Sequence, residues 1–276
     1  MHRRTFLKAA VAAAVPIAPI MGASYGLYEA GSVRIERPTI ALPNLPASFD
    51  KLRIAFLTDI HHGPYVGLDY VASIVRTTLA LGPDLILHGG DYISKDAKYV
   101  APCFEMLAGL KAPLGVFGVL GDHDYRHGVE ETKAAMQAAG IAELTNRGVW
   151  LERGTSRLRL GGVDDLWYGK PDVRPALGDA STSDACLVVS HNPDFVEKMW
   201  DSRVGLAFSG HTHGGQVYVP GYGAPIVPSR YGQKYLQGLV QAPVTRVYVS
   251  RGLGTVTPPM RYNSHPELTL ATLVTQ

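Results

Sequence analysis

Cysteine is scarce in this 276-residue chain, and neither sign of charge is in strong excess. The two cysteines, Cys103 and Cys186, stand far apart and form no metal-binding spacing, which predicts two buried thiols. Internal repeats, low-complexity tracts and long charged runs are also missing. The remaining composition, 46% hydrophobic and 18% charged, is that of an ordinary globular protein, long enough to form one large core.

Acidic residues are absent before Glu29, whereas Arg3, Arg4 and Lys8 are basic. Without these three basic side chains the chain holds 23 basic against 24 acidic residues, so its formal charge is about −1. This balance gives no general electrostatic reason to expect nucleic acid or an acidic membrane surface as a partner. We therefore predict no nucleic-acid partner.

Residues 1–30 resemble a twin-arginine export signal. The pair Arg3-Arg4 precedes Phe-Leu-Lys, and residues 9–23 follow without any charge. That apolar stretch contains two prolines and is too short and weak for an ordinary transmembrane helix. The resemblance implies export by the twin-arginine machinery to the periplasm or the outer face of the cytoplasmic membrane. No clean Ala-x-Ala site is present, so the leader is either cleaved or retained as an anchor; the alternative is a basic, disordered N-terminus.

The rest of the chain predicts a linker followed by one α/β domain. Three prolines in residues 31–50 resist regular structure, and residues 51–276 form the predicted domain. Apolar runs predict strands at 52–58, 84–88, 115–120, 186–190, 206–209, 245–251 and 268–274, and helical spacing predicts helices at 70–81, 99–110, 129–139 and 194–200. Alternation of the first three strands with helices predicts parallel pairing. Short strands at 141–145, 149–153 and 157–163 predict an antiparallel addition to the same sheet.

Five of the predicted strands stop in side chains that can bind a metal ion. Because the carboxyl ends of parallel strands meet at one edge of a sheet, we expect these side chains to converge. They are Asp59, His61, Asp91, Asp122, His191, His211 and His213. A mixed set of carboxylates and imidazoles suits Mn, Fe or Zn better than calcium. Seven ligands are too many for one tetrahedral ion and predict two ions that share a carboxylate, an arrangement suited to displacement at phosphorus.

The same motifs, in the same order, resemble those of the calcineurin-like metallophosphoesterases. They are Asp-x-His at 59–61, Gly-Gly-Asp at 89–91, Gly-Asp-His-Asp at 121–124, Ser-His-Asn-Pro at 190–193 and Gly-His-Thr-His-Gly-Gly at 210–215. The resemblance is closest to the exported bacterial phosphodiesterases of that family and extends over roughly residues 45–274. It implies an αββα sandwich, in which two packed mixed β-sheets carry helices on both outer faces.

The resemblance also implies a role for each residue of the set. Asp91 would bridge two divalent or mixed-valence ions, the first bound by Asp59, His61 and His213, and the second by Asp122, His191 and His211. A hydroxide held between the ions would attack phosphorus. His123 would protonate the leaving oxygen or stabilise charge there, and Asp124 would fix the ring of His123.

One position departs from the family pattern, which has Asn where this chain has Asp122. The additional carboxylate makes the predicted site less positive by one charge. A less positive site favours phosphodiesters over phosphomonoesters, or else a trivalent ion such as Fe(III). The alternative is that Asp122 simply replaces one oxygen ligand with another.

The sequence leaves the substrate open. We expect hydrolysis of a phosphodiester or a pyrophosphate, and the resemblance is compatible with a phospholipid or a UDP-diacylglucosamine-like substrate. Arg251 and Arg261 are predicted to bind it, because guanidinium groups bind phosphate in a bidentate manner. Tyrosines and leucines of 217–240 form either a rim for a lipid tail, with peripheral membrane contact, or packing against the core. A second hypothesis is a metal-binding envelope protein with decayed hydrolytic activity, for which Asp122 is the only indication.

Overall fold

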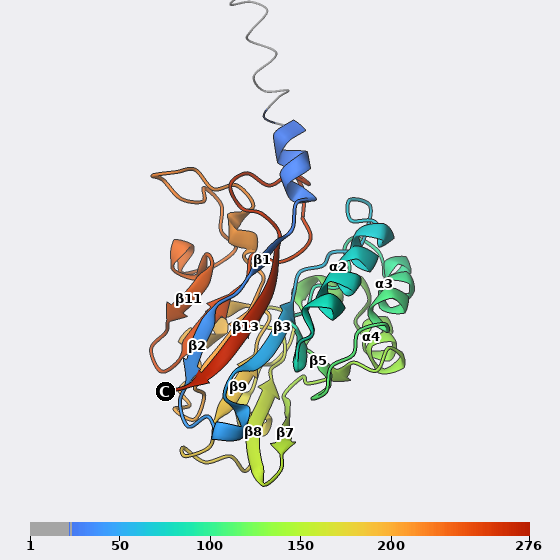
Figure 1. Cartoon of the computed structure of the whole chain (residues 1–276). Coiled ribbons are helices and arrows are strands. Elements are labelled where there is room, and N and C mark those ends of the chain that lie inside the picture. The colour runs from blue at the N-terminus through green and yellow to red at the C-terminus, as the bar shows by residue number, and fades with distance from the viewer. Residues whose placement is uncertain (1–21, 23) are drawn as a thin grey trace, which may run out of the picture.

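Figure 1 shows a computed structural model of the chain, which describes residue 22 and residues 24–276. The predicted leader, 1–30, therefore lies mostly outside the described residues. Its last part, 24–30, is helical and packs on one end of the domain. No helix in the described part of the chain combines the length and the hydropathy needed to cross a bilayer.

The first of two mixed β-sheets has the strand order β1-β13-β3-β4-β5-β6, and β2 also pairs with β13. Its strands are β1 (Arg34–Glu36), β2 (Thr39–Leu42), β3 (Leu52–Leu57), β4 (Leu85–His88), β5 (Val116–Gly118), β6 (Ala142–Glu143) and β13 (Glu267–Thr275). The central strands β3, β4, β5 and β6 run parallel, as predicted from their alternation with helices. Three helices cover the outer face of this sheet: α2 (Leu68–Leu81), α3 (Val100–Leu107) and α4 (Asp122–Ala138).

The second sheet has the order β11-β12-β10-β9-β8-β7. Its strands are β7 (Arg147–Arg153), β8 (Ser156–Gly162), β9 (Cys186–Val189), β10 (Leu206–Ser209), β11 (Gly238–Gln241) and β12 (Arg246–Val249). Shorter elements accompany it: α5 (Val173–Leu177) and the 3-10 turns η1 (Ala47–Phe49), η2 (Ala97–Tyr99), η3 (Pro193–Glu197), η4 (His213–Gly215) and η5 (Gly232–Tyr235). Residues of α5 and η3 pack on the outer face of this sheet. The predicted fold of two packed mixed sheets flanked by helices is confirmed.

The core between the sheets sets how their strand ends approach one another. Strand β3, which pairs antiparallel with β13 and parallel with β4, is central in the sheet and buried on both faces. Its residue Phe56 points toward the second sheet and meets Phe208 of β10 with 5.4 Å between ring centroids, whereas Leu57 packs toward the helices. Because the two sheets are joined by such contacts, the carboxyl ends of β3 and β10 emerge next to each other.

The prediction of a linker over 31–50 needs correction. Strands β1 and β2 lie in this segment and pair with the two halves of the nine-residue strand β13. Pro38 separates the two strands, at the point where its missing N–H disrupts no ladder. The proline content therefore marks a break between two edge strands rather than an unstructured connection.

The sheet assignment of the short strands near 150 also needs correction. Only β6 joins the first sheet, and it pairs in parallel with β5. Strands β7 and β8 form a hairpin that joins the second sheet, because β8 pairs with β9. The predicted helix at 194–200 is the 3-10 turn η3, and helix α4 begins at Asp122, well before the predicted start at 129.

Candidate metal centre

The structure brings the seven predicted ligands together at the carboxyl ends of five strands. Three of these strands, β3, β4 and β5, belong to the first sheet, and β9 and β10 belong to the second. The seven ligands fall into two compact groups, each with all potential ligand atoms within 4.8 Å of one another: Asp59, His61 and His213 in the first, and Asp91, Asp122, His191 and His211 in the second. A third group by the same criterion joins His61 and Asp91 to His123. All seven residues are buried.

Asp91 belongs to the second group and also faces the first. Its Oδ2 is 3.5 Å from His61 Nε2 in the first group and 3.4 Å from His191 Nε2 in the second. Its Oδ1 accepts a hydrogen bond from the backbone N–H of His123 at 2.8 Å, which fixes the orientation of the carboxylate. One carboxylate oxygen thus faces both groups at once, which is the position of a bridging ligand.

The chemistry of the donor atoms fits cations. His61 Nε2 lies 3.0 Å from His213 Nε2, and burial lowers the pKa of both rings well below the ordinary value, which favours their neutral forms. Asp122 Oδ1 is buried and accepts no hydrogen bond from the described residues. Burial opposes the charging of His191, but the carboxylates of Asp91, Asp122 and Asp59 together outweigh it and raise the pKa of His191. The buried carboxylates therefore favour positive charge beside them.

The backbone around these ligands is strained. Five of them adopt a left-handed conformation with φ between 51° and 70°: Asp59, His61, Asp91, His211 and His213. Such values are uncommon for residues other than glycine, and clusters of them occur at functional sites. Close approach adds a further constraint, since a Cβ at Gly121 would lie 2.2 Å from Asp91 Oδ1. The glycines in the motifs thus allow the backbone to reach the carboxylates.

Comparison with known proteins assigns the chain to a family. The profile of one family, described as calcineurin-like phosphoesterase, matches residues 52–215. The chain belongs to the calcineurin-like phosphoesterase family. It is 34% identical over 280 residues to the uncharacterized metallophosphoesterase YkuE of Bacillus subtilis (strain 168), with 99% of this chain and 98% of the relative covered. It is 33% identical over 279 residues to the phosphodiesterase YaeI of Escherichia coli (strain K12), with 99% and 100% covered. This membership identifies the chain as a metal-dependent phosphoesterase.

His123 of this phosphoesterase lies at the edge of the centre. Its ring centroid is 4.6 Å from that of His61, and it is partly exposed whereas the seven ligands are buried. Burial lowers the pKa of His123 to about 4. The predicted role of Asp124 as its orienting partner needs correction. The Asp124 carboxylate accepts hydrogen bonds from the backbone N–H groups of Asp91, Tyr92 and Gly121 at 2.8–3.0 Å, so it fixes the two loops that carry Asp91 and Asp122.

The two arginines predicted to bind substrate are paired inside the protein. Arg261 is fully buried; its Nη2 donates to the carbonyls of Arg251 and Gly254 at 2.8 and 2.6 Å and lies 3.2 Å from His213 Nδ1. Arg251 Nη2 donates to Glu36 Oε1 at 2.6 Å. This corrects the prediction, because the buried guanidinium of Arg261 supports His213 and its loop, and that of Arg251 holds an ion pair with β1.

Sequence reasoning missed three residues that border the centre. Arg126 Nη2 lies 2.6 Å from Asp122 Oδ2, one helical turn away on α4. The ring of Trp167 meets that of His211 edge-on at 4.4 Å, yet Trp167 is 45% exposed, and Tyr168 lies beside the Arg126 guanidinium. The Asp165 carboxylate accepts the N–H groups of both aromatic residues, which fixes their loop. The i,i+4 spacing of Asp122 and Arg126 in the sequence predicts this ion pair if both residues lie on one helix.

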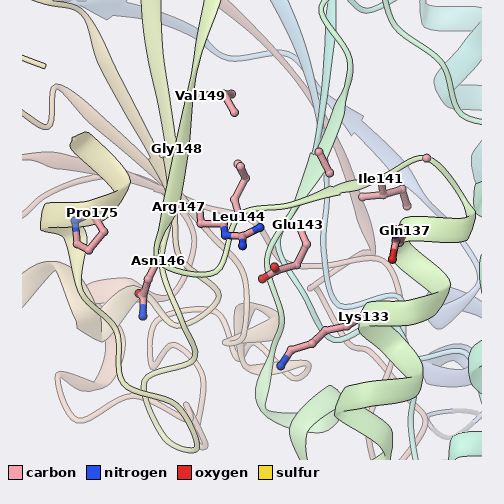
Figure 2. Close-up of a pocket in the computed structure, with 12 residues that line it drawn as sticks. Lys133, Gln137, Ile141, Glu143, Leu144, Asn146, Arg147, Gly148, Val149 and Pro175 are labelled. Carbon is pink, nitrogen blue, oxygen red and sulfur yellow. The ribbon is translucent and has the colours of Figure 1, made fainter. Parts of the chain in front are cut away.

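A large cavity of about 940 Å³ lies elsewhere, between the C-terminal part of α4 and the edge strands β6 and β7. Figure 2 shows Lys133, Glu143 and Arg147 among the side chains that line it. None of the seven candidate ligands contributes to its lining. The cavity therefore does not serve as the phosphoester site that the metal centre defines.

The Asp122–Arg126 pair predicts how the centre binds anions. Arg126→Gln removes one positive charge, so the inhibition constant for inorganic phosphate should rise about fivefold, as expected for a partly exposed, screened charge. The double variant Arg126→Gln with Asp122→Asn should have an inhibition constant for phosphate near the wild-type value. Lys133→Gln, further along α4, serves as the control and should change nothing. Steady-state inhibition, with metal content measured in parallel, tests this; an unchanged constant for Arg126→Gln would contradict it.

Proposed function

We propose that this phosphoesterase binds two metal ions of the Mn, Fe or Zn type and hydrolyses phosphodiester or pyrophosphate bonds. The observation that carries the proposal is that Asp91 Oδ2 lies 3.5 Å from His61 Nε2 of the first buried donor group and 3.4 Å from His191 Nε2 of the second. One ion would be held by Asp59, His61 and His213, and the other ion by Asp122, His191 and His211. Asp91 would contribute to both sites. When bound, such ions lower the pKa of water and draw charge from phosphoryl oxygens.

The protein's own residues supply position and hydrogen bonds. The backbone N–H of His211 donates to both carboxylate oxygens of Asp59 at 3.0 Å, which ties the last histidine motif to the first aspartate. The ring of His123 stands beside His61 and is partly exposed, so it can donate a hydrogen bond to the leaving oxygen of a bound ester. His123 thus acts on the substrate, while Asp124 acts on the backbone beneath it.

The diester preference rests on the named phosphodiesterase relative and not on Asp122. Arg126 returns the positive charge that Asp122 removes, so the net charge equals that of a centre with Asn and no arginine. The same pairing removes the only indication of a decayed, purely metal-binding protein. An amphipathic substrate, such as a phospholipid or a UDP-diacylglucosamine-like molecule, is supported by exposed apolar residues of the 217–240 segment, among them Tyr222 and Ile226.

Export is also part of the proposal. The pair Arg3-Arg4 followed by the uncharged stretch 9–23 supports a twin-arginine signal, so the enzyme acts in the periplasm or on the outer face of the cytoplasmic membrane, with the leader cleaved or retained as an anchor. Replacing both arginines by lysine should leave the protein in the cytoplasm on cell fractionation. Normal export of that variant would contradict this route.

Purified, metal-loaded protein should hydrolyse bis(4-nitrophenyl) phosphate faster than 4-nitrophenyl phosphate. His123→Ala should lower kcat about 100-fold, the usual scale for loss of a proton-transferring or hydrogen-bonding side chain, and leave the metal content unchanged. His127→Ala, on the same helix, is the matched control and should retain activity. Unchanged kcat in His123→Ala would refute the role of that residue, and turnover of neither ester by the loaded wild type would refute the reaction class.

A further inference from the structure

One end of the domain presents uncharged chain segments that are rich in tyrosine. It consists of four segments that contain no Asp, Glu, Lys, Arg or His, namely 24–28, 63–68, 216–229 and 252–260, together with Tyr262. We call this set the tyrosine face. Its exposed large apolar side chains are Tyr25, Leu27, Tyr28, Tyr65, Leu68, Val219, Tyr222, Ile226 and Tyr262. Such a concentration of exposed apolar groups marks an interaction surface.

Direct contacts join the segments into one surface. The rings of Tyr25 and Tyr262 meet edge-on at 5.6 Å, and Tyr218 N–H donates to the carbonyl of Tyr262 at 2.7 Å. A cavity of about 360 Å³ separates residues 27–31 from residues 64–67 and is lined by side chains from both. Figure 1 shows the N-terminal helix and the loop after β10 at the same end of the molecule. The four segments are therefore neighbours in space although they are distant in sequence.

The helix at 24–30 exposes apolar side chains and buries its charged one, the reverse of a helix that faces water. Its one charged side chain, Glu29, is fully buried, and Oε1 accepts the N–H of Ser264 at 2.7 Å. Tyr28, in contrast, is 72% exposed, and Tyr25 and Leu27 are exposed as well. A helix in contact with water places acids outside and apolar residues inside. Burial of the acid beneath exposed tyrosines indicates that the outer side of this helix faces a less polar medium.

The tyrosine face is physically connected to the metal centre. The loop 252–261 contributes to the face and also contacts two candidate ligands. Gly254 N–H donates to the carbonyl of Asp59 at 2.6 Å, and Arg261 Nη2 lies 3.2 Å from His213 Nδ1. The same loop receives the helix, since Arg261 N–H donates to the carbonyl of Gly26 at 3.0 Å. The loop 252–261 thus links the face directly to the first donor group.

We propose that the tyrosine face rests on the surface of a lipid bilayer and orients the metal centre toward lipid-borne phosphoesters. The main argument for a bilayer as the partner is the sequence of residues 9–23, which carry no charge and directly precede the helix at 24–30. Tyrosine is favoured at membrane interfaces, where its ring meets lipid and its hydroxyl meets water. Since the face offers no lysine or arginine, it suits neutral headgroups. The substrate part rests on the proposed function; the docking part does not.

Site-specific labelling of the full-length protein tests the docking. Ile226→Cys, at a residue 78% exposed in the face, is labelled with an environment-sensitive NBD fluorophore; the native Cys103 and Cys186 are buried. Trp200→Cys, at a residue 76% exposed outside the face, is the matched control. With phosphatidylcholine vesicles, emission from position 226 should increase and shift to the blue, and emission from position 200 should stay unchanged. No assay of activity is needed, so failure of the docking is distinguishable from failure of the proposed reaction.

Three results would overturn the docking. An unresponsive label at 226 would show that the tyrosine face does not enter lipid, and equal responses at both positions would show non-specific adsorption. A shift at 226 without vesicles that accompanies dimer formation would assign the face to a second copy of the chain. For the substrate part, Tyr28→Ser with Tyr65→Ser, two exposed residues of the face that lie outside the 217–240 segment, should lower turnover of a vesicle-borne phosphodiester about tenfold, through lost apolar burial, and leave turnover of a water-soluble diester unchanged. Equal losses on both substrates would contradict it.

Discussion

Three aspartates and four histidines, all buried, face one another where the strands of two sheets end, and the rest of the structure depends on how their charge is satisfied. The imidazole nitrogens approach to 3.0 and 3.1 Å, and Asp91 Oδ2 is shared between the two groups. Buried carboxylates without compensating charge are costly, and five of the seven residues also hold left-handed backbone conformations. Cations that bind all seven groups would offset both costs, which explains why a folded chain tolerates the arrangement.

Supporting residues hold this centre from several directions. Asp124 accepts hydrogen bonds from backbone N–H groups of two loops that carry ligands. Arg261 donates hydrogen bonds to carbonyls of the 251–264 segment and contacts His213. Arg126 balances Asp122 from the solvent side of α4. Asp122 together with Arg126, one helical turn away, therefore has the same net charge as the asparagine of the family pattern. The charge of the centre is set by the pair and cannot be read from Asp122 alone.

The sequence was sufficient for features that depend on local order along the chain. Each ligand directly follows an apolar run, so the convergence of Asp59, Asp91 and His211 followed from the rule that parallel strands end at one edge. Features that depend on distant partners were not accessible. Strands β1 and β2 exist because β13, at the other end of the chain, offers them an edge. The burial of Arg261 likewise depends on carbonyls that fold around it, and its residue type alone suggested a substrate contact.

The central claim is that the two donor groups hold two metal ions through a shared Asp91. Elemental analysis of the purified full-length protein, by inductively coupled plasma mass spectrometry, measures the metal bound per chain for the wild type and for Asp91→Ala. The account predicts two equivalents in the wild type and a clear loss in the variant, because both ions lose a ligand at once. One equivalent or none in metal-saturated wild type, or two equivalents retained by Asp91→Ala, would contradict it.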